Sequence, residues 1–268
     1  MASITRLDDS TVTERAVKLH AGLITTAFGL AIAVLATAHV LFQWIRYDLG
    51  MPEFYGLVRL FDMGVEANLP TFFSAFQLLI VCLLLVVVGL TMRQRRDRYA
   101  RHWLVLALIF FLLAADEMAE VHEMTIRPIR EIAPWLVTGL FYWAWVIPAA
   151  ILVVVVAFSY AKFVFAYLPA DMRKATLIGA ALFVGGAVGV EMPEAMFAQD
   201  NGIENFTYAL FVLLEETMEM AGILVFLSGL LRYFSRQVGV VAMQVVPAPM
   251  AAAAIAPSHF PATRRPAL

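Results

Sequence analysis

Six stretches of the sequence are dominated by apolar side chains and are each about 20 residues or longer. They cover approximately residues 19–45, 70–92, 103–124, 135–158, 175–196 and 208–233. A helix of about 20 apolar residues spans the hydrocarbon core of a bilayer. Only 15% of the residues are charged, whereas soluble domains have about 25%. The sequence therefore predicts an all-α, polytopic membrane protein built as a bundle of six transmembrane helices.

The segments outside these stretches divide the chain into three parts. Residues 1–18 form a mostly polar N-terminal segment, residues 19–233 form the membrane domain, and residues 234–268 form a tail rich in Ala and Pro. We expect the first stretch to be an uncleaved helix and the tail to be disordered. The chain has a single cysteine, Cys82, which excludes an internal disulfide and a Cys-x-x-Cys metal site.

The basic residues predict how the chain is oriented. Of the 19 Lys and Arg residues, 15 lie in the two termini and in the second and fourth loops. The other loops hold only four, which are Arg46, Arg59, Arg127 and Arg130. Short cytoplasmic loops are enriched in Lys and Arg, so both termini should be cytoplasmic. The basic residues thus have a topological explanation, and nothing in the sequence suggests binding to nucleic acid.

The acidic residues have the opposite distribution. Five of the 21 Asp and Glu residues fall on the predicted cytoplasmic side, and 16 fall at or toward the outer face. Four arginines cannot neutralise 16 carboxylates. These carboxylates must be solvated, protonated or bound to cations.

The positions of the acids along the helices indicate that some of them are deep. At about 1.5 Å per residue, Glu219 should lie roughly 16 Å below the start of its helix. Asp116 should lie about 12 Å from the end of its helix. A solvated rim, where the helices leave the membrane and meet water, can explain the positions of Glu123 and Glu194. It explains the positions of Asp116 and Glu219 poorly. Ionisable groups at bilayer depth are costly and indicate a functional site.

Helical spacing groups the acids into faces. Residues three and four apart share a face, so Asp116, Glu120 and Glu123 should form one stripe. Glu215 with Glu219 and Glu191 with Glu194 should form two others. His122 points nearly opposite the first stripe on an ideal helix. It either serves a different partner, or the helix is distorted before Pro128.

Carboxylates and histidines between helices are typical of metal sites, although the Glu-x-x-His pair of di-iron bundles is absent. A hard, oxygen-rich site suits calcium, magnesium, manganese or iron better than copper or zinc. We therefore expect a divalent metal ion, with iron, manganese, calcium and zinc all left open. His39 is either a nitrogen ligand or a buried neutral histidine. The candidate ligands are Asp116, Glu120, His122, Glu123, Glu191, Glu215, Glu219 and His39.

Three motifs carry a family resemblance. They are Asp116–Glu123, Leu214–Gly222 and Glu66-Ala-Asn-Leu-Pro70. Over about residues 20–235 the chain resembles a group of uncharacterised bacterial multi-pass membrane proteins. These proteins share an Asp-Glu…His-Glu helix and a Glu-Glu…Glu-Met-x-Gly helix. The resemblance implies a shared outward-facing site in a bacterial inner membrane, but no named activity.

Three classes of function remain. The first is a membrane metalloprotein or metalloenzyme, whose partners are membrane lipids and whose ligand is a lipid or small hydrophobic molecule from the outer leaflet. The second is a cation or proton transporter that uses the carboxylates as an ion path. The third is a structural or sensory protein. Ser-His-Asp, Cys-His and His-x-x-x-His signatures are absent, which argues against a recognised hydrolase or desaturase.

Overall fold

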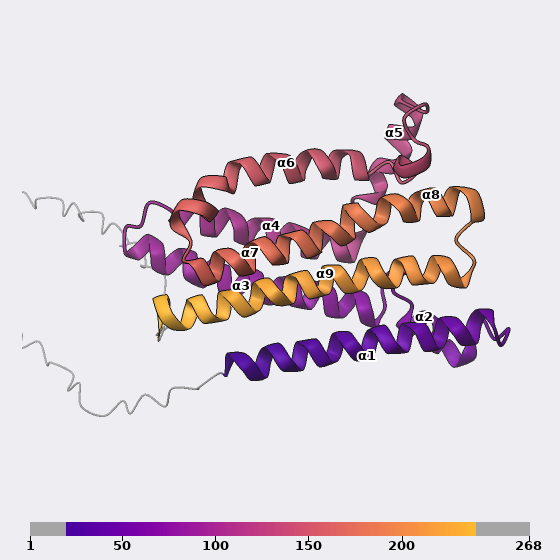
Figure 1. Cartoon of the computed structure of the whole chain (residues 1–268), viewed down its shortest axis with the longest axis horizontal. Coiled ribbons are helices and arrows are strands. Elements are labelled where there is room, and N and C mark those ends of the chain that lie inside the picture. The colour runs from indigo at the N-terminus through magenta and orange to yellow at the C-terminus, as the bar shows by residue number, and fades with distance from the viewer. Residues whose placement is uncertain (1–19, 240–268) are drawn as a thin grey trace, which may run out of the picture.

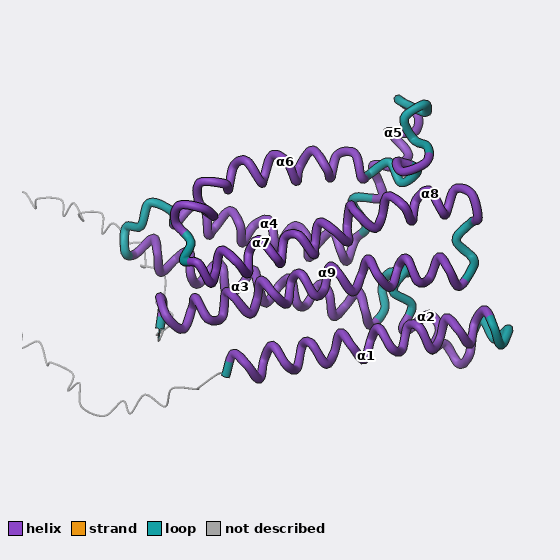
Figure 2. Tube along the Cα trace, viewed as in Figure 1, coloured by secondary structure: helices purple, strands orange, loops and turns teal. Residues whose placement is uncertain are grey.

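The computed structural model describes residues 20–239, and all regular secondary structure in this range is helical (Figures 1 and 2). Residues 1–19 and 240–268, which include the expected N-terminal segment and most of the expected tail, lie outside the described residues. The described start of that tail, Phe234–Val238, continues the last helix as a π-helical turn.

Five helical segments are long and apolar enough to cross a membrane, which fits an integral membrane protein. These are α1 (Ala21–Tyr47), α3 (Leu69–Gln94), α4 (Ala100–Ala119), α6 (Val146–Lys162) with its π-helical extension Phe163–Tyr167, and the α7–α8 segment. The last comprises α7 (Ala170–Val184), a π-helical segment (Gly185–Val190) and α8 (Glu191–Asn201).

The last long helix is α9 (Phe206–Tyr233), which has 28 residues. It packs against α1 and α7, as Figure 1 shows. Its length is sufficient for a span, but Glu215, Glu216 and Glu219 lower its apolar character. The short helices α2 (Leu57–Phe61) and α5 (Ile126–Ile132) lie in the connections at the end of the bundle that holds α8.

The structure shortens two of the expected helices. The third was expected to reach residue 124, but α4 ends at Ala119 because Glu120 adopts the left-handed conformation with φ +49°. The fourth was expected to begin at residue 135, but α6 begins at Val146. The residues before it form irregular chain with a 3₁₀ turn at Gly139–Phe141.

The core lies where α3, α4 and α9 meet. Val81, Leu85, Trp103, Leu227 and Leu230 are fully buried there. In a water-soluble protein, burial of each such side chain contributes about 1.5–3 kcal/mol to the free energy of folding. Inside a bilayer the contribution comes instead from packing, since lipid is as apolar as these side chains.

Close contact between α7 and α9 depends on small residues. A Cβ atom at Gly179 would lie 2.8 Å from the carbonyl oxygen of Gly222, and one at Gly222 would lie 2.6 Å from the amide nitrogen of Phe183. The two helix backbones therefore approach more closely than larger residues would allow, as at other membrane helix interfaces.

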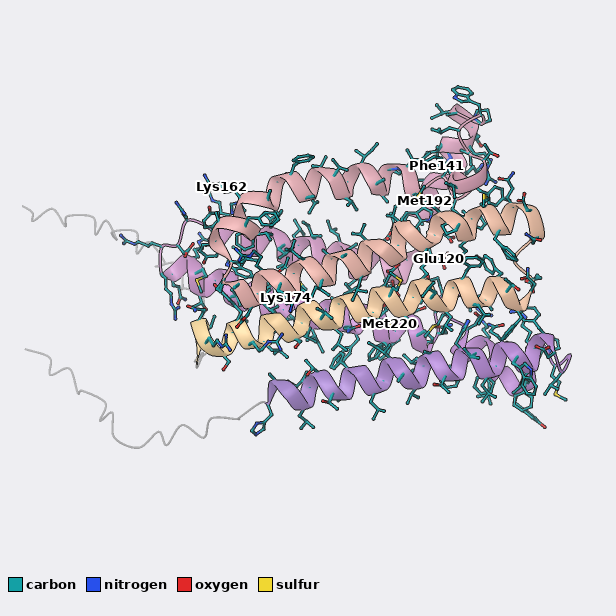
Figure 3. The ribbon with its side chains drawn as sticks, viewed as in Figure 1. Glu120, Phe141, Lys162, Lys174, Met192 and Met220 are labelled. Carbon is teal, nitrogen blue, oxygen red and sulfur yellow. The ribbon has the colours of Figure 1, made fainter. Side chains whose placement is uncertain are left out.

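Charge separates the two ends of the bundle. Figure 3 shows Lys162 and Lys174 toward one end and Glu120 and Met192 toward the other. We call the first the basic end; it also holds the arginine-rich α3–α4 connection. We call the other the acidic end; it is where α4 and α6 reach the start of α8.

Candidate functional site

Three glutamates from two helices meet at the acidic end. Ligand oxygens of Glu191, Glu194 and Glu215 all lie within 4.8 Å of one another. The residues are 8%, 3% and 9% exposed. We call this group the three-glutamate cluster. Glu191 and Glu194 come from the first turn of α8, and Glu215 comes from α9.

A glycine in the π-helical segment brings these two helices together. A Cβ atom at Gly186 would lie 2.7 Å from the carbonyl oxygen of Glu215 and 2.9 Å from Cγ of Glu219. Only glycine permits this approach without a backbone shift. The π-helical segment Gly185–Val190 leads directly into Glu191, and such segments are frequent at functional sites.

The polar contacts of the three-glutamate cluster are few. The indole Nε1 of Trp145 donates to Oε1 of Glu191 at 3.1 Å, and Tyr208 lies beside Glu194. Oε2 of Glu194 is buried without a hydrogen-bond partner. The ion pairs among residues 20–239 join none of the three glutamates to Lys or Arg. The cluster therefore lacks the protein cation that buried carboxylates usually have.

Asp116 and His122 form a second element of the site. Oδ1 of Asp116 accepts the backbone N–H of His122 at 2.8 Å, and Oδ2 accepts ring Nδ1 at 2.9 Å. The left-handed turn at Glu120 makes this possible because it directs the chain back toward the last turn of α4. We therefore confirm the expected distortion before Pro128. The prediction of a continuous 116/120/123 helical stripe is wrong, since the α-helix has ended.

Trp145 links the pair to the three-glutamate cluster. The rings of His122 and Trp145 have centroids 4.5 Å apart, and the Trp145 indole bonds Glu191. Burial opposes the charge of His122, but the hydrogen bond and charge of Asp116 outweigh burial and raise the pKa of His122. Within residues 20–239, no hydrogen bond occupies its Nε2.

A further group of acids lies between α3, α4 and α9. Glu117 lies beside Ser74 and near Glu66, and Glu216 and Glu219 both lie near Glu117. Burial, and then the charge of Glu120, raise the pKa of Glu66 to about 7. Oε2 of Glu66 is buried and has no hydrogen-bond partner. The acids thus form one continuous polar region that includes the predicted candidate Glu219.

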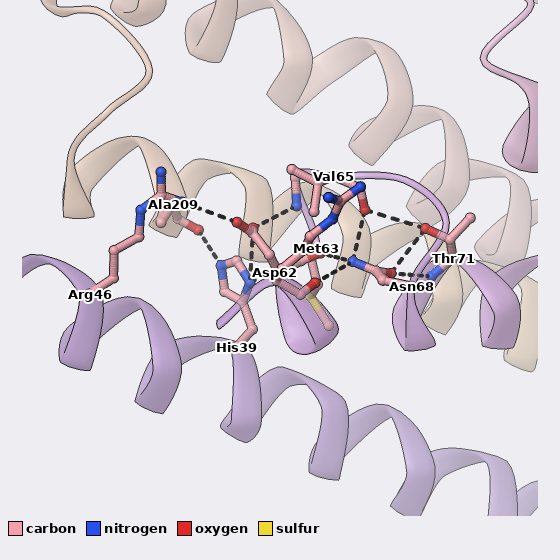
Figure 4. Close-up of polar contacts among 10 residues, drawn as sticks. His39, Arg46, Asp62, Met63, Val65, Asn68, Thr71 and Ala209 are labelled. Atoms are coloured by element: carbon pink, nitrogen blue, oxygen red, sulfur yellow. Dashed lines mark hydrogen bonds and ion pairs between the residues drawn. The ribbon is translucent and has the colours of Figure 1, made fainter. Parts of the chain in front are cut away.

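His39 lies in a different network, shown in Figure 4. Its Nδ1 accepts the backbone N–H of Met63 at 2.9 Å, and its Nε2 lies 3.0 Å from the carbonyl oxygen of Ala209. These contacts require a neutral ring with the proton on Nε2. His39 is 1% exposed and has no free nitrogen for a metal. The contacts match the buried neutral histidine that the sequence left open.

Asp62 and Arg46 complete this network. Arg46 pairs with Asp62 at 3.3 Å and also with Glu204. Asn68 caps α3 by accepting the backbone N–H of Thr71 at 3.2 Å. The network joins α1, the α2–α3 connection and α9, so it supports the acidic end structurally.

The structure changes the expected depth of the acids. Asp116 lies three residues from the end of α4, or about 4.5 Å, and not about 12 Å. A 20-residue helix such as α4 is about 30 Å long, the thickness of the hydrocarbon core. Asp116 therefore lies near the boundary of the core. Glu219 is 13 residues into α9, about 20 Å from its start.

The predicted candidates are partly brought together. Glu191 and Glu215 meet directly, and Asp116 pairs with His122. Glu120 and Glu123 lie at the turn beyond α4, and Glu123 is exposed. Glu194 had been explained by a solvated rim, yet it is almost fully buried. Neither Trp145 nor Tyr208 was among the predicted site residues, since an aromatic residue at a membrane boundary is ordinary.

Residues 27–234 match a family model described as Domain of unknown function (DUF8692). The chain belongs to this family. The DUF8692 region begins within α1 and ends directly after α9, so it includes every residue of the site described above. No curated protein and no solved structure matches the chain.

Proposed function

We propose that this protein is a six-span bacterial inner-membrane protein whose acidic end binds a divalent metal ion at the three-glutamate cluster. The observation that supports this proposal is the meeting of Glu191, Glu194 and Glu215, all buried, with ligand oxygens within 4.8 Å. The sixth span in this proposal is α9, and both termini are cytoplasmic, so the acidic end faces the periplasm.

Electrostatics leaves two ways to stabilise the cluster. Carboxylates this close cannot all be ionised unless a cation neutralises them. Either they share protons, or they bind a metal. Three buried carboxylates provide oxygen ligands of the type that calcium, manganese and iron prefer, and the unpartnered Oε2 of Glu194 remains available as a ligand.

His122 strengthens the metal hypothesis. Histidines that bind metals usually donate their other ring N–H to a carboxylate, which fixes the tautomer and the ring orientation. Asp116 holds Nδ1 of His122 in this way and leaves Nε2 free. We propose that Nε2 serves either as a nitrogen ligand or as a base that accepts a proton from metal-bound water.

The position of the site suggests its substrate. A metal here would lie near the outer boundary of the bilayer, because α4 ends three residues beyond Asp116. A Lewis-acidic ion at this depth could polarise an oxygen of a lipid or a small hydrophobic molecule. We therefore favour a membrane metalloprotein that acts on such a molecule.

A proton-binding role is the second candidate. It is favoured by Glu66, whose pKa of about 7 lets it exchange a proton near neutral pH, and by the neighbouring acids Glu117 and Glu216. In this case the three-glutamate cluster would share protons and hold no metal. Metal analysis distinguishes the two candidates.

The test is metal content by elemental mass spectrometry. The full-length protein purified in detergent would be compared with a Glu191→Gln/Glu215→Gln variant and with Glu53→Gln, an exposed acid outside the site. We expect close to one metal ion per chain in the wild type and in Glu53→Gln, and at least a tenfold loss in the double variant. Absence of metal from the wild type, even after metal is supplied, would contradict the proposal.

A further inference from the structure

An apolar cavity lies next to the site, on the side of the basic end. It has a volume of about 440 Å³ and lies between α4, α6 and α7, with part of α9 at its back. Its walls include Phe110, Val156, Ala180, Phe183 and Phe226. The volume lies within the range of about 300–1,000 Å³ that is typical of ligand pockets. Water does not fill a space lined by hydrocarbon, so an apolar group is the ligand that this space fits.

The cavity exists because α6 stands away from the bundle. Val146 alone is buried among the 17 residues of α6, and α6 lies at the edge of the bundle in Figure 1. Hydrogen bonds nevertheless fix both ends of the α6 segment. At its C-terminal end, Tyr160 donates to the carbonyl oxygen of His102 at 2.9 Å, and Tyr167 donates to Asp97 at 3.0 Å.

The other end of α6 is held by Trp145, which donates to Glu191. Hydrogen bonds therefore tie the α6 segment to α4 at one end and to α8 at the other, while the middle of α6 stays unpacked. The space between the helices is a built feature of the fold.

The cavity has the length of a lipid chain. Along α4 its wall runs from Trp103 to Leu113, ten residues or about 15 Å. This is about half of the 30 Å hydrocarbon core, and it begins three residues from the start of α4 at the basic end.

One end of the cavity leads to the acidic end. Leu113 lies three residues before Asp116 on α4. On the opposite wall, Val184 directly precedes the π-helical segment that leads into Glu191. The cavity is thus apolar along its length, and ionisable groups follow within a few residues at both ends, since Arg101 and Arg173 lie close in sequence to the wall residues Trp103 and Met172 at the other end. This shape matches an amphiphile with one hydrocarbon chain.

We infer that the cavity binds one acyl chain of a membrane lipid, with an ester, amide or phosphate oxygen of the lipid at the three-glutamate cluster. The head-group part rests on the proposed function, since bare carboxylates would repel such oxygens and a bound metal would attract them. The acyl chain fills the space between α4, α6 and α7. Long-chain lipids are therefore the substrate class that we infer for the site.

Photochemical labelling tests the acyl-chain site. The full-length protein would be placed in nanodiscs of phosphatidylethanolamine and phosphatidylglycerol that include a phosphatidylethanolamine with a diazirine in one acyl chain. After irradiation, labelled peptides would be mapped by mass spectrometry. We expect labelling of Phe226, which is 6% exposed and lines the cavity. Labels confined to the outer surface would overturn the inference.

Paired variants separate the cavity from the surrounding lipid. Ala157→Phe places a ring in the cavity wall, and Val154→Phe adds the same ring on α6 outside the wall. We expect at least a fivefold loss of Phe226 labelling in Ala157→Phe and no change in Val154→Phe. Equal labelling in both would overturn the inference. Ala180→Phe, on the opposite wall, replaces Ala157→Phe if that variant does not fold.

The same samples distinguish this inference from the proposed function. Their metal content would be measured alongside the labelling. Phe226 labelling in a protein without metal would contradict the metal site and the head-group contact but support the acyl-chain site. Metal without labelling would overturn the acyl-chain site and leave the metal proposal intact.

Discussion

Asp116 and His122 are joined by two hydrogen bonds that share one carboxylate. The backbone N–H of His122 donates to Oδ1 and its ring Nδ1 donates to Oδ2, at 2.8 and 2.9 Å. The left-handed Glu120 between them closes this loop. The imidazole therefore has a fixed tautomer and orientation, with Nε2 available beside Trp145.

This pairing makes the first prediction. Asp116→Asn should weaken metal binding about 10–100-fold, the usual effect of removing a carboxylate that orients a metal-binding histidine. Asp48→Asn, at an exposed position, should leave the affinity unchanged. The measurement is a metal titration of chelator-treated, folded protein in detergent. An unchanged affinity in Asp116→Asn would remove His122 from the proposed site.

The second prediction concerns Gly186. Gly186→Ala should lower the unfolding free energy by about 1–3 kcal/mol, as overpacking usually does, because its Cβ would meet the carbonyl oxygen of Glu215. Gly22→Ala, in a helix with nothing within 4 Å of its Cβ, should be neutral or slightly stabilising. Thermal unfolding in detergent measures both. A neutral Gly186→Ala would show that α7 and α8 are not held against α9 as described.

The third prediction is a pH dependence that arises from Glu66. Its pKa is about 7 in the folded protein against a usual value of 4.5. Between these values the folded state keeps a proton that the unfolded state has lost, so stability falls as pH rises from about 4.5 to 7. The pKa of His122 is also raised, because His122 pairs with Asp116. Deprotonation of His122 at higher pH therefore lowers the stability further.

Glu66→Gln isolates the first of these contributions. The variant should gain stability on the order of 2 kcal/mol relative to wild type at pH 8 and should match wild type at pH 4.5. The unfolding midpoint of both proteins would be followed against pH in the presence of a chelator. Parallel pH profiles would show that Glu66 ionises normally.

The fourth prediction separates His39 from the metal site. His39→Ala leaves the Met63 N–H buried without an acceptor, which should cost about 1–3 kcal/mol. Metal content of the folded variant should stay at the wild-type level. His20→Ala, an exposed change at the start of α1, should affect neither property. Loss of metal from folded His39→Ala would restore His39 as a ligand.

Hydropathy predicted most of the fold. The apolar runs predicted the approximate positions of the long helices, because helix formation in lipid depends on length and apolar character. Five helical segments of the described residues, against six predicted, are long and apolar enough to span a membrane. Two predicted helix boundaries were wrong. The helix α4 ends at residue 119 and not at 124, and α6 begins at residue 146 and not at 135. Glu120 ends α4 by adopting φ +49°, a choice that local composition does not reveal.

The site was only partly predictable. Spacing on an ideal helix placed His122 away from Asp116, whereas the turn at Glu120 brings the two together. Glu194 looked like a rim acid because its neighbours are polar, but the close contact at Gly186 places it between α8 and α9. Both errors come from tertiary packing at helix ends, where regular geometry no longer applies.

Whether a metal replaces shared protons at the three-glutamate cluster decides between the two leading functions. The most direct measurement is calorimetric titration of chelator-stripped protein with Mn²⁺, repeated in two buffers of different ionisation enthalpy. We predict saturable binding of one ion with release of protons near pH 6, and loss of that binding in Glu194→Gln. Absence of saturable binding in the wild type, or equal binding in Glu194→Gln, would contradict a metal site formed by Glu191, Glu194 and Glu215.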